Sequence, residues 1–357
     1  MFTCSKDSRL KRSCCVFIMG LLCFLVFNSF VKNKNINPPV PAGFPSPVYD
    51  LAKNPITEER FELCRKLFYD PVLSSDSTVS CANCHQQFSA FSNLAHPLSH
   101  GVKGAIGKRN APALQNLIWQ KSFMWDGSVA NLHAQPMTPI LNKLEMNESA
   151  EGVIKKLQRN PAYAAEFKKA FGSKGVSAKT LSLALSQFMA LMISSESKFD
   201  QYLRGDVTFT ASEERGLKTF RQKCAGCHEE PLFTNNDFRN NGLQPNARTP
   251  DSGRAIITAR KEDLFKFKVP SLRNVAVSAP YMHDGRFASL QQVLEHYASG
   301  IFASTAPDAL LGGGLALSAT DKTDIISFLK TLTDRNFLYD KRFSDPFYTQ
   351  NFLKDTH

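Results

Sequence analysis

Two short stretches decide the fold of this 357-residue chain: Cys-Ala-Asn-Cys-His at residues 81–85 and Cys-Ala-Gly-Cys-His at residues 224–228. Cys-x-x-Cys-His is the attachment signature of c-type haem. Its two thiols lie one helical turn apart, each can form a thioether with a haem vinyl group, and the imidazole that follows can bind the iron. A redox-active cysteine pair does not need the histidine, and a zinc site needs more ligands nearby. The sequence therefore predicts two covalently bound haem c groups.

Each motif supplies two thioether cysteines and one proximal iron ligand. These residues are Cys81, Cys84 and His85 in the first motif, and Cys224, Cys227 and His228 in the second. Because haem c is attached outside the cytoplasmic membrane, the motifs also predict an exported, periplasmic protein.

The N-terminus agrees with export. Residues 16–31 form a continuous apolar run that follows several Lys and Arg residues, which is the layout of an export signal. No small-x-small cleavage site follows the run, and this favours an uncleaved anchor over a cleaved signal. Contact with a membrane is expected only through this segment. Residues 36–49 are rich in proline and predict a stiff, extended tether.

The composition is that of a globular protein with room for two domains, since 43% of the residues are hydrophobic and 21% are charged. The formal net charge of +11 does not indicate binding to nucleic acid, because no cluster of Lys and Arg is interleaved with aromatic residues. We expect an export signal or membrane anchor (1–35), the Pro-rich tether (36–49), an N-terminal haem domain (50–205), a C-terminal haem domain (206–340) and a C-terminal tail (341–357).

The two predicted domains are copies of one another. Residues 111–132 match residues 269–290 at a constant offset of 158, and the match includes Asn116 with Asn274. A duplicated haem domain explains this repeat. Helical patterns cover residues 57–68, 148–171, 180–202 and 321–332, and no convincing run of alternating strands is present. The fold class is therefore mostly α: two cytochrome c-like haem domains with long loops and little strand.

The offset also shows where the copies differ. Gln135 and Glu145 in the first half correspond to apolar residues in the second half. Tyr297 in the second half corresponds to Pro139 in the first, and proline cannot bind iron through its side chain. These differences favour an open, reactive first haem and a capped second haem. The alternative is that Gln135 and Glu145 are ordinary polar residues on the surface.

The order of the motifs resembles that of the bacterial di-haem cytochrome c peroxidase family, which includes the di-haem enzyme that matures methylamine dehydrogenase. The resemblance extends from about Thr57 to Thr333. The shared motifs are residues 81–85, 109–112, 125–127, 145–146, 224–228 and 280–285.

The resemblance implies roles for three residues near the haems. Glu145 matches the distal acid–base carboxylate of the peroxidatic haem, and Gln135 lies beside it in the family. Trp125 matches a tryptophan between the haems that helps electrons to cross. The resemblance also implies a calcium site between the domains, formed by Asn110, Ser278 and the carbonyl of Pro280.

The distal iron ligands are less clearly defined by the resemblance. Tyr297 falls where the family places the distal ligand of the second haem, although most of its peroxidases have methionine there. His296 or Met282 are alternatives for this role. His100 is the candidate for a distal histidine that leaves the first iron on activation, and His96 is a weaker candidate. A histidine in a surface loop is the alternative for both.

The expected activity is the reduction of hydrogen peroxide to water, with electrons from a small cytochrome c or copper protein. A maturase-like enzyme that oxidises residues of a partner protein remains an alternative, which Tyr297 favours. A non-catalytic di-haem electron carrier is the second alternative. The resemblance also makes a homodimer one of the assemblies to test.

Overall fold

The structure is a computed structural model that describes residues 35–94, 96–247 and 249–348. The predicted export signal or anchor therefore lies outside the described residues, apart from Asn35. Within the described ranges, no helix has the length and apolar character that crossing a membrane requires. The described residues from Ile36 onward form one compact unit.

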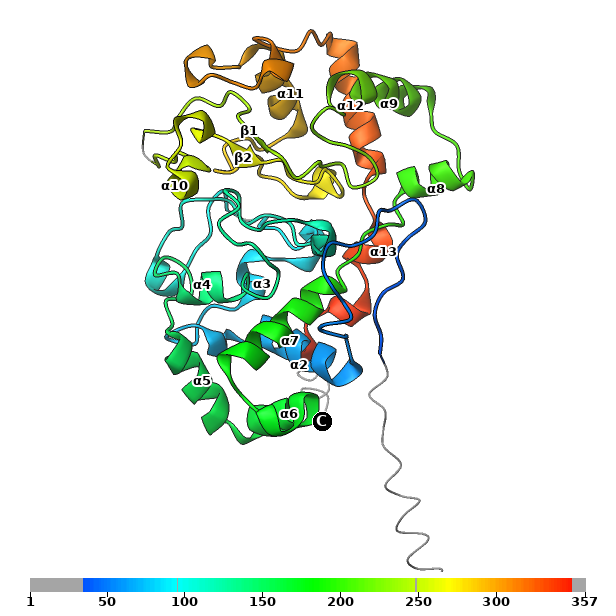
Figure 1. Cartoon of the computed structure of the whole chain (residues 1–357). Helices are drawn as coiled ribbons and strands as arrows, with labels where there is room; N and C mark the ends of the chain where they lie inside the picture. Colours follow the sequence, from blue (N-terminus) through cyan, green and yellow to red (C-terminus); the bar gives the residue numbers. More distant parts are fainter. Residues whose placement is uncertain (1–34, 95, 248, 349–357) are drawn as a thin grey trace, which may run out of the picture. The chain divides into compact units, whose positions relative to one another are not determined.

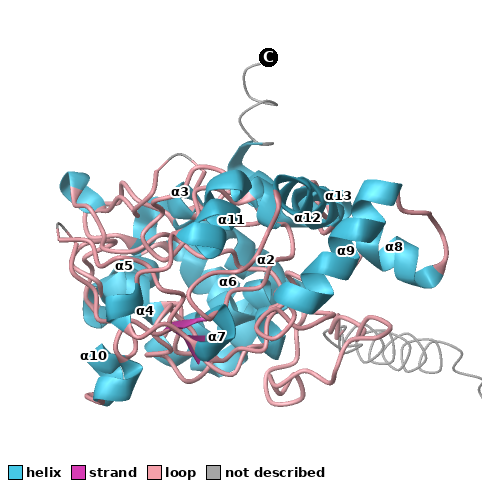
Figure 2. Cartoon of the chain, turned by 90° about the horizontal axis from the view of Figure 1, so that it is seen from above, coloured by secondary structure: helices cyan, strands magenta, loops and turns pink. Residues whose placement is uncertain are grey.

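The described residues are mostly helical, with long loops and one two-stranded sheet, which confirms the predicted fold class (Figures 1 and 2). The first helices are α2 (Glu58–Tyr69), α3 (Cys81–Cys84), α4 (Met137–Leu141), α5 (Ala150–Arg159), α6 (Pro161–Phe171) and α7 (Ala178–Ala190). They are followed by α8 (Lys198–Arg204), α9 (Ala211–Lys223), α10 (Ala255–Thr258), α11 (Leu290–Ser299), α12 (Ala319–Thr331) and α13 (Arg335–Leu338). Strands β1 (Phe238–Arg239) and β2 (Phe267–Lys268) pair antiparallel.

Most of the longer helices begin where the sequence provides a capping side chain. Thr57 accepts a hydrogen bond from the backbone of α2, and Thr210 does the same for α9. The continuous pattern at residues 148–171 is broken in the structure, because Asn160 caps a new helix whose first residue is Pro161. The pattern at 180–202 likewise divides into α7 and α8.

Two clusters of buried side chains form the core. Both are rich in leucine and phenylalanine, and the phenylalanines include Phe61, Phe68, Phe91 and Phe188 in the first cluster and Phe199, Phe220, Phe233 and Phe328 in the second. The helices of the first cluster, α2 and α7, lie together in the lower part of Figure 1, and α9 and α12 of the second lie in the upper part. Each haem motif therefore has a core of its own beside it.

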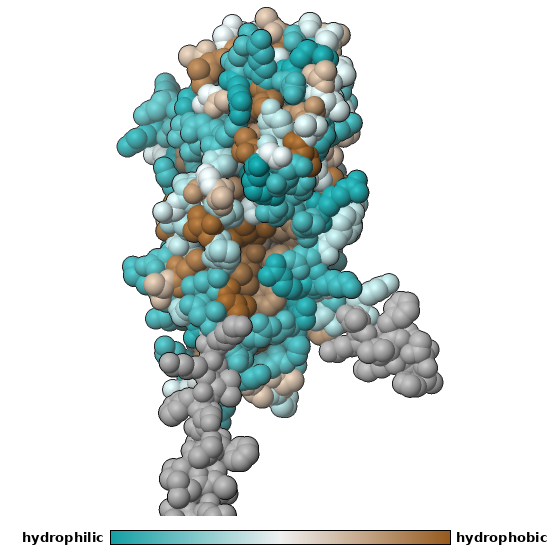
Figure 3. All heavy atoms as spheres, turned by 90° about the vertical axis from the view of Figure 1, so that its right-hand side faces the viewer, coloured by the Kyte–Doolittle hydropathy of each residue, from teal (hydrophilic) through white to brown (hydrophobic). Residues whose placement is uncertain are grey.

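Two segments that were predicted to lie outside the haem domains pack against the first cluster. In the Pro-rich stretch 36–49, Ile36 and Phe44 contact this cluster. Near the C-terminus, Phe343 is buried in the same cluster. Ile36 and Phe44 thus hold this stretch against the first cluster, while Val40 and Val48 are exposed; its role as a tether stays a prediction. Figure 3 shows the side of the protein along which this stretch runs, with apolar residues gathered near the middle of a largely hydrophilic face.

The two copies of the repeat also share their backbone conformation. Asn116 and Asn274 both have a φ of 59° and each precedes a short 3₁₀ turn. Further along, Met124 and Met282 both have positive φ, 65° and 75°. Such conformations are uncommon for residues other than glycine. The duplication inferred from the sequence therefore extends to local geometry.

Candidate haem sites

The first haem motif places a histidine that can bind the haem iron. Cys81 and Cys84 are at the two ends of α3 and neither forms a disulfide. His85 follows, and its Nδ1 lies 2.6 Å from the carbonyl oxygen of Phe91. An imidazole that donates Nδ1–H to a carbonyl keeps the lone pair of Nε2 for a metal. Burial lowers the pKa of His85, and this favours the neutral ring that iron binding needs.

The second motif repeats this arrangement after α9. Cys224 and Cys227 are free thiols, and Nδ1 of His228 lies 3.1 Å from the carbonyl oxygen of Phe233. Burial lowers the pKa of His228 to about 4. In both motifs, then, two reduced cysteines accompany a histidine whose Nδ1 faces a backbone carbonyl oxygen. These residues fit covalently bound haem c.

Glu145 lies close to the first motif. It stands in the loop after α4, where Nδ2 of Asn142 donates a hydrogen bond to its Oε1 at 2.8 Å. Burial raises the pKa of Glu145, and the hydrogen bond from Asn142 opposes this shift. The negative charge of Glu145 contributes to the raised pKa of both Cys81 and Cys84. The carboxyl group is therefore placed to act on a group bound at the first motif.

A loop from the predicted His-containing region holds Glu145 in position. The backbone N–H of Val102 donates to the carbonyl of Glu145 at 2.8 Å. Gly101 approaches so closely that a Cβ atom there would lie 2.3 Å from the carbonyl oxygen of Leu144. Only glycine fits at this position, and the sequence analysis did not single it out.

The candidate histidines lie in the same loop, but their rings face one another. His96 and His100 are both exposed, and their ring centroids are 4.1 Å apart in a stacked arrangement. The carbonyl oxygen of His100 lies 3.8 Å from Sγ of Cys84. His100 therefore reaches the first motif through its backbone in this structure. Gln135 precedes α4, where its carbonyl accepts a hydrogen bond from the N–H of Thr138.

Tyr297 lies beside the second motif. It lies on α11, and the charges of Cys224 and Cys227 add to the effect of burial, which raises the pKa of Tyr297 to about 12. Its hydroxyl forms a hydrogen bond with the side chain of Asn241. The two halves thus present different chemical groups to their haem motifs: a carboxyl group in the first and a phenol in the second.

Asn241 joins the three residues that were alternatives for the distal ligand. Its Nδ2 donates to Sδ of Met282 at 3.4 Å, and it also bonds Tyr297. Its backbone carbonyl oxygen lies 2.9 Å from Nε2 of His296. Nε2 of His296 therefore faces a backbone oxygen, whereas the side chains of Tyr297 and Met282 share the Asn241 amide as a partner. The sequence carried no motif that marked Asn241.

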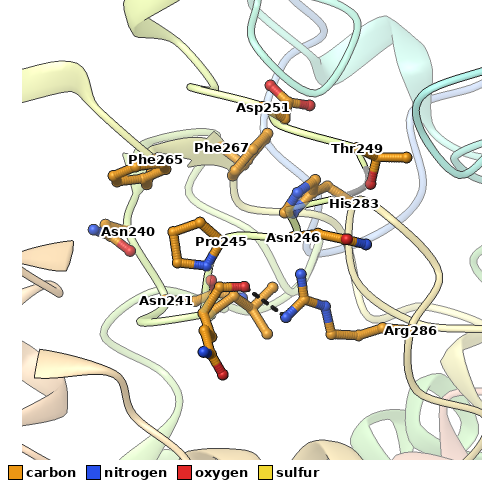
Figure 4. A pocket seen from close by; sticks show the side chains of 12 residues that line it. Asn240, Asn241, Pro245, Asn246, Thr249, Asp251, Phe265, Phe267, His283 and Arg286 are labelled. Carbon is orange, nitrogen blue, oxygen red and sulfur yellow. Dashed lines mark hydrogen bonds between the residues drawn. The ribbon is translucent and has the colours of Figure 1, made fainter. Parts of the chain in front are cut away.

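A small polar pocket connects Asn241 with the contact between the halves (Figure 4). His283 and Arg286 line it, and the ring of His283 stacks on Phe267 with centroids 3.7 Å apart. Arg286 donates a hydrogen bond at 2.8 Å to the carbonyl of Gln244, on the opposite wall.

Trp125 lies where the two halves meet. Its ring is 6.4 Å from the ring of His283, which is its counterpart at the 158-residue offset. The backbone N–H of Lys268 donates to the carbonyl of Trp125 at 2.7 Å, and that of Asn110 donates to the carbonyl of His283, also at 2.7 Å. The repeats therefore meet about a pseudo-twofold axis that passes near Trp125.

An ion-pair cluster also crosses this contact. Arg109 bonds Asp126 of its own half at 2.6 Å and Asp251 of the second half at 2.6 Å. Asn110, one of the predicted calcium residues, follows Arg109 in the chain; it is buried and donates Nδ2 to the carbonyl of Pro97 at 3.0 Å. Ser278 and Pro280 lie in the second half, directly before Tyr281. Their role in a calcium site remains a prediction.

Comparison with known proteins identifies several similar chains. A family model described as di-haem cytochrome c peroxidase matches residues 58–208. The methylamine utilization protein MauG of Methylorubrum extorquens is 36% identical over 295 residues, which cover 78% of this chain and 79% of that protein. The cytochrome c551 peroxidase of Pseudomonas aeruginosa is 32% identical over 304 residues, which cover 82% of this chain and 83% of that protein.

Solved structures show the same fold. The crystal structure of a MauG-like protein associated with microbial copper homeostasis has a TM-score of 0.79 and 32% sequence identity, and the match covers 87% of this chain and 99% of that one. The diheme peroxidase BthA from Burkholderia thailandensis has a TM-score of 0.69 at 24% identity and covers 80% of this chain and 88% of its own. The second likeness concerns the fold alone.

Proposed function

The chain belongs to the di-haem cytochrome c peroxidase family, and on this premise we propose that it reduces hydrogen peroxide to water at its first haem. Electrons enter at the second haem from a small cytochrome c or copper protein. The observation that carries this assignment is the unequal surroundings of the two motifs. Glu145 lies beside Cys81 and Cys84, whereas Tyr297 lies beside Cys224 and Cys227.

In this proposal, His85 and His228 hold the two haem irons, and the iron at His85 supplies the redox chemistry that cleaves the O–O bond. Glu145 takes a proton from one peroxide oxygen and returns it to the other, which leaves as water. Two electrons and two further protons complete the conversion of one peroxide to two waters. Burial raises the pKa of Glu145, which brings it closer to working pH, as a group that both accepts and donates a proton requires.

The proposed electron path passes Trp125, whose carbonyl bonds Lys268 of the second half. Tyr297 is the proposed distal ligand of the second iron, with Met282 as the alternative. Gln135 is proposed to line the distal side of the first haem with Glu145. His100 stays a candidate ligand of the first iron, and binding would require its ring to leave that of His96.

Other parts of the assignment follow from the family. We propose a calcium ion at Asn110, Ser278 and the carbonyl of Pro280. We also propose a periplasmic location, with any membrane contact made through residues 1–35, and two haem domains over residues 50–205 and 206–340. A homodimer is the assembly to test first.

The experiment is steady-state peroxide turnover of the holoprotein with a reduced small cytochrome. Replacement of Glu145 by Gln should lower kcat by about 10²–10⁴-fold, because it removes the group that moves the proton. Glu151→Gln is the matched control, since this residue is an exposed carboxylate on α5, and it should keep wild-type activity. Equal rates for wild type and Glu145→Gln would disprove the proposed mechanism.

A maturase-like activity is the second candidate, and one observation favours it: the phenol of Tyr297 is held beside the second motif. Such an enzyme uses peroxide to oxidise residues of a partner protein. Rapid turnover with a reduced cytochrome supports the peroxidase, and peroxide-dependent oxidation of a partner without such turnover supports the maturase.

A further inference from the structure

The contact between the halves contains a partly buried lysine whose charge the proposed mechanism does not use. Nζ of Lys268, on β2, donates to the carbonyl oxygen of Ser122 at 2.6 Å and to the side-chain oxygen of Gln120. It lies 5.7 Å from the centroid of the Phe123 ring. A lysine of the second half thus binds the first-half loop that leads to Trp125.

The internal repeat shows which residues of the other half correspond to this lysine and its partners. At the offset of 158, Asn110 corresponds to Lys268, Gln120 to Ser278, and Ser122 to Pro280. The ammonium group and its two oxygen partners therefore form the pseudo-symmetric counterpart of the proposed calcium site. A carbonyl oxygen at residue 122 takes the place of the carbonyl at residue 280, and a side-chain oxygen at 120 takes the place of the hydroxyl at 278.

The backbone shows that the two positions are equivalent in space as well as in sequence. The N–H of Asn110 bonds the carbonyl of His283, and the N–H of Lys268 bonds the carbonyl of Trp125, both at 2.7 Å. These two bonds exchange under the pseudo-twofold axis. The side chains at positions 110 and 268 consequently start from matching points, one on each side of the contact.

The chemistry of the two positions differs in a single respect. Asn110 can offer only a neutral amide, so oxygen atoms gathered around it need a cation from solution, and Ca²⁺ prefers such oxygen ligands. The ammonium group of Lys268 carries its own positive charge and donates hydrogen bonds to oxygen atoms. Burial lowers the pKa of Lys268 to about 7, and the charge of Asp126 opposes this shift. Two oxygen acceptors and a nearby carboxylate compensate in part for the loss of water.

We propose that the Lys268 ammonium is a built-in cation that takes the place of a metal ion in the second copy of the cation site and thereby positions residues 120–125, with Trp125 at their end. Lys268 is a positioning residue, because it acts through Trp125. The comparison with a metal site depends on the proposed calcium site. The positioning of the loop by Lys268 depends on its bonds to Gln120 and Ser122.

The test is hydrogen–deuterium exchange of the backbone amides of residues 120–125 in the holoprotein, measured with a calcium chelator and with calcium. In Lys268→Met, the exchange should be about tenfold faster than in wild type under both conditions, because two bonds from a charged donor are lost. Lys268→Asn installs the residue of position 110. It should exchange as fast as Lys268→Met in chelator and return toward the wild-type rate with calcium.

Each other outcome overturns the inference. Wild-type exchange in Lys268→Met would show that the ammonium does not hold the loop. Fast exchange in Lys268→Asn that calcium leaves unchanged would make Lys268 an ordinary structural lysine. If neither variant folds, Gln120→Ala provides the test, because it keeps the ammonium group and removes one of its two acceptors. This variant should speed the exchange of residues 120–125 by a smaller factor than Lys268→Met. Exchange at the wild-type rate would contradict the proposal. A measurement of the calcium bound to the wild-type protein tests the proposed site at Asn110 separately. Failure of that site can therefore be distinguished from failure of the inference about Lys268.

Discussion

The first and second haem motifs sit in the same scaffold but are covered by different elements. Over the first motif, an irregular loop brings Gly101 against the backbone of Glu145. Over the second, the regular helix α11 carries Tyr297, which Asn241 fixes. A side chain on a loop can be retracted or exchanged more easily than one on a helix. The comparison indicates that duplication preserved the attachment chemistry, whereas the covering elements diverged between the proposed reactive site and the proposed electron-entry site.

After the replacement of Glu145 itself, the largest effect is expected from crowding the loop that covers the first motif. In Gly101→Ala, the new methyl group meets the carbonyl oxygens of Leu144 and Glu145, so the carboxyl group must move. We expect peroxide turnover to fall by about tenfold to a hundredfold, because a small misplacement of a proton-transfer group is costly. The optical spectrum of the second haem should not change.

The control for this change is Gly104→Ala in the same loop. Gly104 has open space around its Cβ position but a φ of +73°, so the variant reports backbone strain without the contact. A larger loss in Gly104→Ala than in Gly101→Ala would attribute the effect to loop strain and not to Glu145.

A smaller effect should appear in the pH dependence of the first site. Asn142 donates to Glu145 and holds its pKa down against the effect of burial. Asn142→Ala should therefore raise the pKa of Glu145 further. Because the carboxylate must be ionised to accept the first proton, kcat/KM falls as the pH drops through this pKa, and the acidic limb of the profile should move to higher pH in the variant. The profile of Glu151→Gln should coincide with that of the wild type, and an unshifted limb in Asn142→Ala would show that another group titrates.

The sequence predicted the parts of this molecule that depend on local spacing. Both haem motifs and the offset between Asn116 and Asn274 are readable from the chain because they involve neighbouring residues or a direct repeat. The meeting of Trp125 with His283 was not predicted, because the offset identifies counterparts but does not say how two copies dock. Asn241 was missed for a similar reason, since its bonds to Tyr297 and Met282 join segments that are distant in the chain.

Two further features could not be read from the sequence. The Pro-rich stretch 36–49 was predicted to be an extended tether, and its Ile36 and Phe44 contact the first cluster, since burial of apolar side chains is favourable. The ring of His100 stacks on that of His96, which the sequence did not predict, and its role as an iron ligand stays a prediction. Side-chain direction in an irregular loop has no periodic signal in the sequence.

The inequality of the two irons is tested most directly by electron paramagnetic resonance of the oxidised holoprotein, in wild type and in Tyr297→Phe. The account predicts one high-spin signal and one low-spin signal in wild type. In Tyr297→Phe, the low-spin signal should convert to high spin while the first signal stays unchanged. Two low-spin signals in the wild type, or a change in the original high-spin signal in Tyr297→Phe, would contradict an open first haem beside a capped second one.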